Sequence, residues 1–132
     1  MPFDIQVTRT REPKPRPPAG DLGFGRFYSD HLFLADYDGR GWQNPRIVPH
    51  GPLPIDPAAS ALQYAQAMFE GMKAVPGERG PLLFRPDMHV RRFNASARRL
   101  CMPEVPEADF LTALRAIVRE DASWVPTEPG AA

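Results

Sequence analysis

Residues 84–103 read FRPDMHVRRFNASARRLCMP, and their spacing predicts a helix over 87–102. The apolar side chains of this stretch recur three and four positions apart, which places them on one helical face: Val90, Phe93, Ala97, Leu100 and Cys101. Pro103 cannot continue a helix and is expected to end it. Because free cysteine behaves as a small apolar residue, Cys101 is expected to pack inertly against this face.

A second helix is expected to begin at Pro106, because proline is preorganised for the first helical position. The apolar residues after it share one face: Phe110, Leu114, Ile117 and Val118. Upstream, apolar runs bounded by turn residues predict strands over 27–37 and 42–49, joined by a tight turn at 38–41.

Between the strands and these helices, the pair Asp56-Pro57 predicts the start of a further helix, which Gly71 ends or bends. Residues 72–75 and 81–85 flank a turn rich in proline and glycine, and they predict a β-hairpin. Strands followed by helices indicate an α+β domain, in which antiparallel strands pack with two or three helices.

Composition divides the chain into three parts. Residues 1–21 contain closely spaced prolines, which favour extended backbone without amide donors, and they are expected to form a flexible Pro-rich arm. Residues 22–125 are expected to form the folded domain, and residues 126–132 have the composition of a linker. A chain of 132 residues is large enough for one modest core.

The charge balance argues against two classes of partner. Lys and Arg together number 16, as do Asp and Glu, so neither a nucleic acid nor an anionic membrane is expected to be a partner. No apolar run has membrane-spanning length, and the single Cys101 suits a reducing compartment, so a cytoplasmic location is expected. The three histidines lack metal-ligand spacing, so no metal site is expected.

The helix predicted over 87–102 carries one candidate anion site. Arg92, Ser96 and Arg99 share a flank of this helix, next to its apolar face. Guanidinium and hydroxyl groups that converge in this way suit a phosphate monoester, which an arginine can hold with two parallel hydrogen bonds. The alternative is a solvated basic face whose side-chain stems cover the core.

Three blocks carry a resemblance to a known family. Residues 64–74 read YAQAMFEGMKA, residues 84–86 read FRP and residues 91–103 read RRFNASARRLCMP. In this order they resemble the N-terminal small domain of branched-chain amino-acid aminotransferases, which are pyridoxal 5′-phosphate (PLP) enzymes of fold type IV. The similarity runs from about Leu22 to Pro126.

The resemblance implies roles for four residues. Arg92 matches the arginine that binds the PLP phosphate, and Phe24, Tyr64 and Phe69 match residues that line the pocket for the side chains of Leu, Ile and Val. The family's Schiff-base lysine lies in the large C-terminal domain, which is absent from residues 1–132. Since the two lysines here, Lys14 and Lys73, lie elsewhere, no catalytic residue is assigned.

The resemblance also implies a reaction and an assembly. A complete enzyme would transfer the amino group of Leu, Ile or Val to 2-oxoglutarate through PLP, and it would be a homodimer. Residues 1–132 alone are expected to be inactive. Two alternatives remain: a non-catalytic dimerisation or interaction domain, and part of another fold type IV enzyme, of the D-amino-acid aminotransferase or aminodeoxychorismate lyase type.

Overall fold

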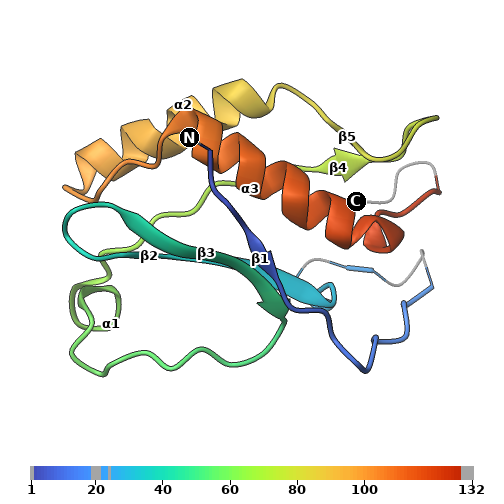
Figure 1. Ribbon diagram of the computed structural model, residues 1–132, viewed down its shortest axis with the longest axis horizontal. Helices are drawn as coiled ribbons and strands as arrows, with labels where there is room; N and C mark the ends of the chain where they lie inside the picture. The colour runs from blue at the N-terminus through green and yellow to red at the C-terminus, as the bar shows by residue number, and fades with distance from the viewer. Residues whose placement is uncertain (1, 19–21, 24, 129–132) are drawn as a thin grey trace.

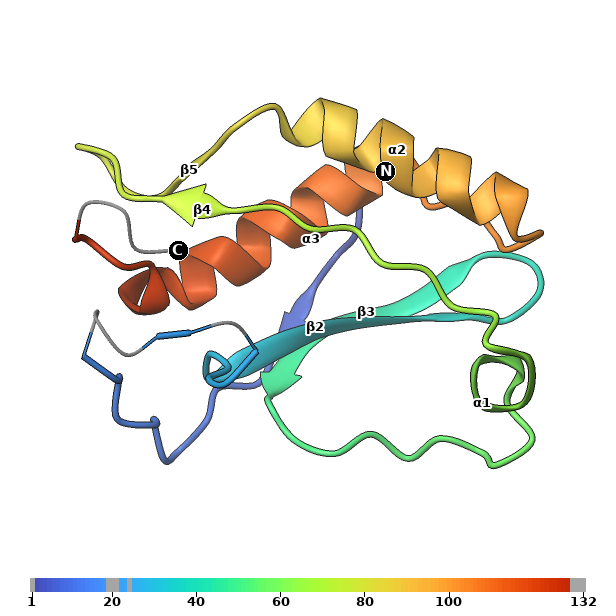
Figure 2. The same ribbon diagram turned by 180° about the vertical axis from the view of Figure 1, so that it is seen from behind.

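A computed structural model describes residues 2–18, 22–23 and 25–128 (Figures 1 and 2). Its centre is a three-stranded sheet in the order β1-β3-β2. Strands β2 (His31–Tyr37) and β3 (Trp42–Pro49) pair in antiparallel fashion, and β1 (Gln6–Val7) pairs in parallel with β3. The sheet therefore has a short parallel edge contributed by the start of the chain.

Two long helices cover one face of this sheet. Helices α2 (Pro86–Arg99) and α3 (Glu107–Glu120) lie above it in both views, with α3 nearer the strands (Figures 1 and 2). Four shorter elements complete the described residues: α1 (Ser60–Tyr64), β4 (Ala74–Val75), β5 (Leu82–Leu83) and the 3₁₀ helix η2 (Ala122–Trp124). Strands β4 and β5 form an antiparallel hairpin.

The core lies between the sheet and the helices. The most buried apolar side chains come from β3, α2, α3 and the connection between the helices: Ile47, Val90, Ala97, Val105 and Ala113. The rings of Phe93 and Phe110 meet edge to face across α2 and α3 with 5.0 Å between their centroids, which is a favourable aromatic geometry. Asn94 exchanges two hydrogen bonds with the backbone of Val105, which fixes the helix connection to α2.

The predicted α+β class is confirmed. Strand β3 has the bounds expected from the sequence, β2 lies within the predicted 27–37, and α3 begins directly after Pro106. The turn expected at 38–41 is stabilised by the Asp38 carboxylate, which accepts hydrogen bonds from the amides of Arg40 and Gly41. The parallel pairing of β1 was not anticipated, because the strand has two residues and no alternating pattern.

The helix expected to run from Asp56-Pro57 to Gly71 is wrong in extent. Helix α1 ends at Tyr64, after which Ala65 adopts a left-handed conformation with φ of 52°. Residues 66–73 form no helix. Two of their side chains instead bind α2 and its end, through Gln66 and Glu70, and these long-range contacts outweigh the local apolar spacing.

The expectation for Cys101 is also wrong. Its side chain is exposed, and its φ of 54° places it in the left-handed position just after α2. The amide of Met102 donates to the carbonyl of Ala97 at 2.9 Å, which is the hydrogen bond of a Schellman helix end. Helix α2 therefore ends at Arg99, three residues before the end expected at Met102, and Cys101 turns away from the apolar face.

A buried polar network joins the start of the chain to the sheet and to the end of α3. His31 is 8% exposed and Asp121 is 7% exposed. Asp121 accepts hydrogen bonds from the His31 amide (2.9 Å) and from His31 Nδ1 (2.7 Å). His31 Nε2 accepts a hydrogen bond from the Thr10 amide at 2.9 Å, so the imidazole is neutral with its proton on Nδ1.

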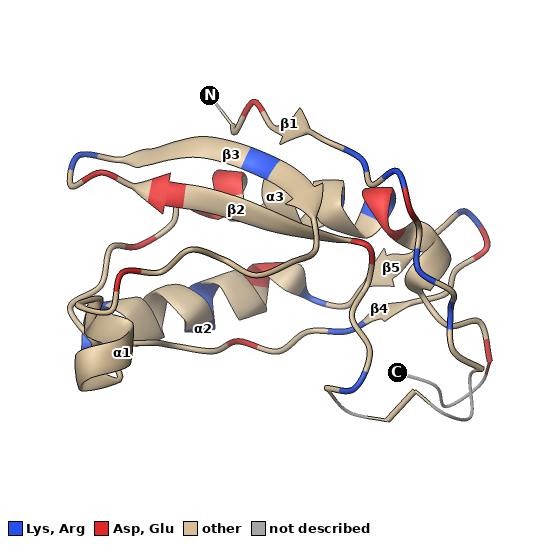
Figure 3. Ribbon diagram, turned by 90° about the horizontal axis from the view of Figure 1, so that it is seen from below, with Lys and Arg blue, Asp and Glu red and all other residues tan. Residues whose placement is uncertain are grey.

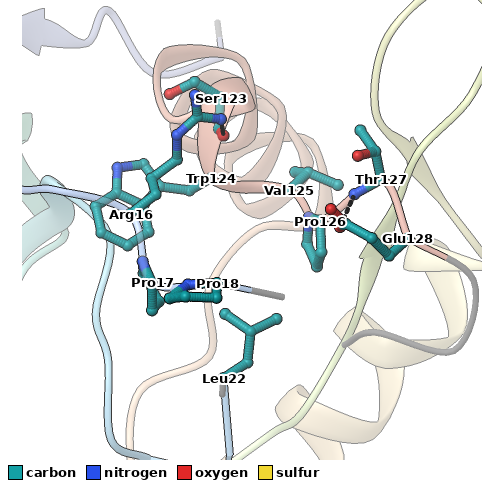
Figure 4. Close-up of a pocket in the computed structure, with 10 residues that line it drawn as sticks. All are labelled: Arg16, Pro17, Pro18, Leu22, Ser123, Trp124, Val125, Pro126, Thr127 and Glu128. Carbon is teal, nitrogen blue, oxygen red and sulfur yellow. Dashed lines mark hydrogen bonds between the residues drawn. The ribbon is translucent and has the colours of Figure 1, made fainter. Parts of the chain in front are cut away.

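Further contacts hold the arm beside the C-terminal end of α3. The Asp30 carboxylate accepts hydrogen bonds from the Lys14 amide and the Trp124 indole, and these donors, the amide foremost, lower the pKa of Asp30. Arg16 donates to the carbonyl of Ser123, and Figure 4 shows its side chain beside Trp124. The division into arm, domain and linker stays a prediction, and part of the expected arm contributes β1.

We expect Asp121→Asn to lower the free energy of unfolding by about 2 kcal/mol, because the new amide group leaves one buried His31 donor without an acceptor. Urea denaturation followed by circular dichroism measures the change. The matched control is Asp36→Asn, which removes the charge of a half-exposed ion pair with Arg46 and should change stability little. Equal losses for both variants would contradict the structural role of the His31–Asp121 pair.

Candidate functional site

One depression of the surface combines guanidinium, hydroxyl and aromatic groups. Arg92, Ser96 and Arg99 line it from α2, as their spacing predicted. The remaining lining residues come from the segment 66–73 and from the end of α2 and its flank: Ala67, Met68, Phe69, Ala95 and Leu100. The depression therefore has a polar helical wall with donors for an anion, opposite a wall that is mostly apolar.

Glu70 holds Arg92 beside this depression. Arg92 Nε donates to Glu70 Oε2 at 2.6 Å, and Nη2 donates to Oε1, so the contact is bidentate. His89 Nδ1 lies 2.9 Å from the same Oε1. The hydrogen bonds from Arg92 first, and from His89 second, lower the pKa of Glu70 to about 2.

Sequence reasoning missed Glu70 and His89. Glu70 lies inside the quoted block 64–74, but the part of that block up to Gly71 was expected to be helical and gave no sign that Glu70 pairs with α2. The contacts span 19 positions to His89 and 22 to Arg92, beyond the reach of any local pattern.

The contact with Glu70 leaves part of Arg92 free. A guanidinium has five N–H donors in a planar fork, and Glu70 occupies those on the Nε side. The donors of Nη1 and the second donor of Nη2 remain, and the Arg92 side chain is 66% exposed. Together with the Ser96 hydroxyl and the Arg99 guanidinium, this donor set fits a phosphate monoester.

The three aromatic residues expected at the substrate pocket do not form one pocket in the described residues. Phe69 lines the depression and is 84% exposed. Tyr64 is equally exposed and is not among the lining residues. Phe24 lies outside the described residues. The assigned roles of Arg92, Phe24, Tyr64 and Phe69 stay predictions.

Both lysines are away from the depression's lining residues. The Lys14 ammonium donates to the carbonyls of Tyr28 (3.3 Å) and Ser29 (2.8 Å). These two residues lie just before β2, at the end of that strand away from the turn at 38–41. Lys73 is exposed in the segment before β4. Neither side chain lines the depression that holds Arg92.

A second hollow lies between the arm and the residues after α3 (Figure 4). Its charged lining residues are Arg16 and Glu128, and Arg16 is already bound to the Ser123 carbonyl. In the part of the chain that the structure describes, no three His, Cys, Asp or Glu side chains gather as metal ligands. The depression on α2 is therefore the stronger candidate site.

Charge is spread over the molecule. Figure 3 shows basic and acidic residues interspersed on the strands and on α2. Within the described residues, no helix combines the length and the apolarity needed to cross a bilayer.

Comparison with curated proteins finds branched-chain-amino-acid aminotransferases among the relatives of this chain. Over 128 residues the chain is 43% identical to branched-chain-amino-acid aminotransferase 2 of Bacillus subtilis (strain 168). The aligned region covers 96% of this chain and 35% of that relative. It is 46% identical over 110 residues to branched-chain-amino-acid aminotransferase of Mycobacterium tuberculosis (strain ATCC 25618 / H37Rv), covering 82% of the chain and 30% of the relative. A probable branched-chain-amino-acid aminotransferase of Staphylococcus aureus (strain N315) is 39% identical over 127 residues, or 96% of the chain and 36% of the relative. No protein-family model matches the chain.

The α+β fold and these relatives together define the chain as an aminotransferase homologue. Over most of its length the chain is homologous to part of the branched-chain-amino-acid aminotransferases, as the three sequence blocks indicated. The chain spans about 35% of the length of the curated relatives it matches.

We expect acid to weaken the fold through Glu70. Because its pKa is lowered from near 4.5 to about 2 in the folded state, the ionised carboxylate stabilises the protein above about pH 4.5. That contribution is lost as the pH falls from 4.5 toward 2. Thermal melts between pH 6 and pH 2 should show a shallower acid dependence for Glu70→Gln than for the parent chain.

The control for this measurement is Asp87→Asn, which removes a more exposed carboxylate, in the first turn of α2, from its partner Arg85 just before that helix. Water and salt screen that pair, so its removal should alter the acid dependence less. Parallel pH profiles for Glu70→Gln and the parent chain would contradict the assigned role of Glu70.

Proposed function

We propose that the chain is part of a PLP-dependent enzyme that transfers the amino group of Leu, Ile or Val to 2-oxoglutarate. The observation that carries this proposal is the depression on α2, where Arg92 keeps free donors beside Ser96 and Arg99. The names of the relatives supply the reaction class and the branched-chain substrates.

In this proposal Arg92 binds the phosphate of PLP through the donors that Glu70 leaves free. Ser96 adds a hydroxyl donor and Arg99 adds a second positive charge on the same wall. When bound, PLP supplies an electron sink for the transfer of the amino group. Phe69 places an apolar ring at the edge of the depression. We propose that Tyr64 and Phe24 join Phe69 in lining the pocket for an aliphatic side chain only in the complete enzyme.

The chain by itself is proposed to be inactive. Transamination needs a lysine that moves a proton beside the cofactor, and neither Lys14 nor Lys73 lines the depression. The relatives are about three times as long as the matched region, so the remaining part of such an enzyme has room for that lysine and for the rest of the pocket.

The complete enzyme is proposed to be a cytoplasmic homodimer. Several large apolar side chains on the described surface are strongly exposed, among them Tyr64, Phe69 and Phe84. Exposed apolar side chains that form a contiguous surface are typical of sites that another protein surface covers. The same observation favours the second candidate function, a non-catalytic interaction domain, which would bind a partner without any need for Arg92.

We expect Arg92→Ala to weaken PLP binding by about tenfold or more, because a charge-assisted hydrogen bond to the phosphate is lost. Isothermal titration calorimetry of the purified chain with PLP measures the affinity. The control is Arg91→Ala, which removes the same charge from the next position of α2 but from a residue that does not line the depression. Equal losses of PLP affinity in the two variants would mean that positive charge on α2 in general, and not a specific site at Arg92, binds PLP.

We expect no glutamate when this chain is incubated with PLP, leucine and 2-oxoglutarate, because it lacks a lysine beside the depression. A coupled glutamate dehydrogenase assay measures the product. Turnover that disappears in Lys73→Ala would overturn the proposed inactivity, since that lysine would then carry the reaction.

A further inference from the structure

Glu70 has an unusual combination of burial and partners. Its side chain is 6% exposed, whereas its partner Arg92 is 66% exposed. The carboxylate touches Arg92 with both oxygens and His89 with one. Glu70 is not among the residues that line the depression, although Arg92 is. The buried Glu70 carboxylate therefore binds the Arg92 guanidinium from outside the depression.

The geometry of the contact between Glu70 and Arg92 determines which guanidinium donors remain for the depression. Glu70 occupies Nε and one donor of Nη2, so the edge formed by Nη1 and the other Nη2 donor stays open. An arginine can bind a carboxylate on one edge and an anion on the other, because each edge offers two parallel N–H groups. Glu70 thus fixes the guanidinium plane without competing for the open edge.

Two more contacts keep Glu70 itself in place. His89 and Arg92 lie three positions apart on α2, on neighbouring turns of one face, and both reach Glu70 from the same helix. Gln66, at the start of the segment 66–73, donates to the Leu100 carbonyl at 2.9 Å. The segment is therefore attached to α2 at both ends of the depression, between which Met68 and Phe69 form its other wall.

We propose that Glu70 is a positioning residue for anion binding: it holds the Arg92 guanidinium with its open edge toward the depression. This inference rests on the proposed function, in which that anion is a phosphate monoester. A freely rotating arginine would lose side-chain entropy on binding the anion, and the contact with Glu70 removes that cost in advance.

The sign of a mutational effect separates positioning from simple charge. Glu70 carries a negative charge next to the site, so its removal raises the local positive potential. If charge alone matters, Glu70→Ala tightens phosphate binding. If Glu70 positions Arg92, the same substitution weakens binding by about tenfold, because the guanidinium must then be ordered by the anion itself.

The experiment is a titration of the full chain with inorganic phosphate, followed by NMR of the arginine Nε–Hε signals. The variants are Glu70→Ala, Arg92→Ala and the double variant. The control is Asp87→Asn, which removes the acidic partner of Arg85, the residue just before α2. Glu70→Gln, which keeps one acceptor for Arg92, is the second variant in case Glu70→Ala fails to fold.

We expect weaker phosphate binding in Glu70→Ala, an intermediate affinity in Glu70→Gln and no change in Asp87→Asn. In Glu70→Ala, the Arg92 Nε–Hε signal should lose the chemical shift of a hydrogen-bonded group even before phosphate is added. In the Arg92→Ala background, Glu70→Ala should have no further effect, because the two residues act as one unit.

Three results would overturn the inference. They are tighter binding in Glu70→Ala, an unchanged Nε–Hε signal in that variant, and a loss that persists in the Arg92→Ala background. The proposed function fails in a different way, namely when Arg92→Ala binds phosphate as well as the parent chain does, or when the parent chain binds none.

Discussion

The buried pair of His31 and Asp121 is the contact on which the arrangement of this domain depends. It joins the first residue of β2 to the end of α3, 90 positions away, and the far side of the imidazole accepts the Thr10 amide. One side chain thereby links the arm, the sheet and the helical layer. Within the described residues every buried side-chain nitrogen and oxygen atom has a hydrogen-bond partner, so the network stabilises one arrangement of these parts rather than several.

Glu70 does for the candidate site what Asp121 does for the fold. A carboxylate that is nearly buried is costly unless donors compensate it, and Arg92 and His89 supply them. The requirement acts in both directions, since satisfying Glu70 also fixes Arg92. The segment 66–73, which carries Glu70, is not helical, and it forms one wall of the depression.

The candidate site is exposed to solvent, whereas the core of the domain is buried. The sheet and the two long helices bury the core between them, whereas Phe69 and Phe84 remain more than four-fifths exposed. Neither ring belongs to the core of this domain, and exposed apolar side chains of this kind are available for contact with another surface. An open depression with a prepared arginine is the arrangement expected when other parts of an enzyme complete the pocket, as the greater length of the relatives allows.

The sequence determined the elements whose signals are local. Spacing along the chain was enough for β3, α2 and α3, and it placed Arg92, Ser96 and Arg99 on one flank because a helix repeats every 3.6 residues. The three blocks also indicated the family to which the curated relatives belong.

Tertiary structure alone decided the rest. It ended α1 at Tyr64, added β1 to the sheet, exposed Cys101 and paired Glu70 with Arg92. Each of these outcomes depends on groups far apart in sequence or on backbone that must satisfy its hydrogen bonds at a helix end. Periodicity reports which side chains share a face, but only the folded chain determines which buried charge finds which partner.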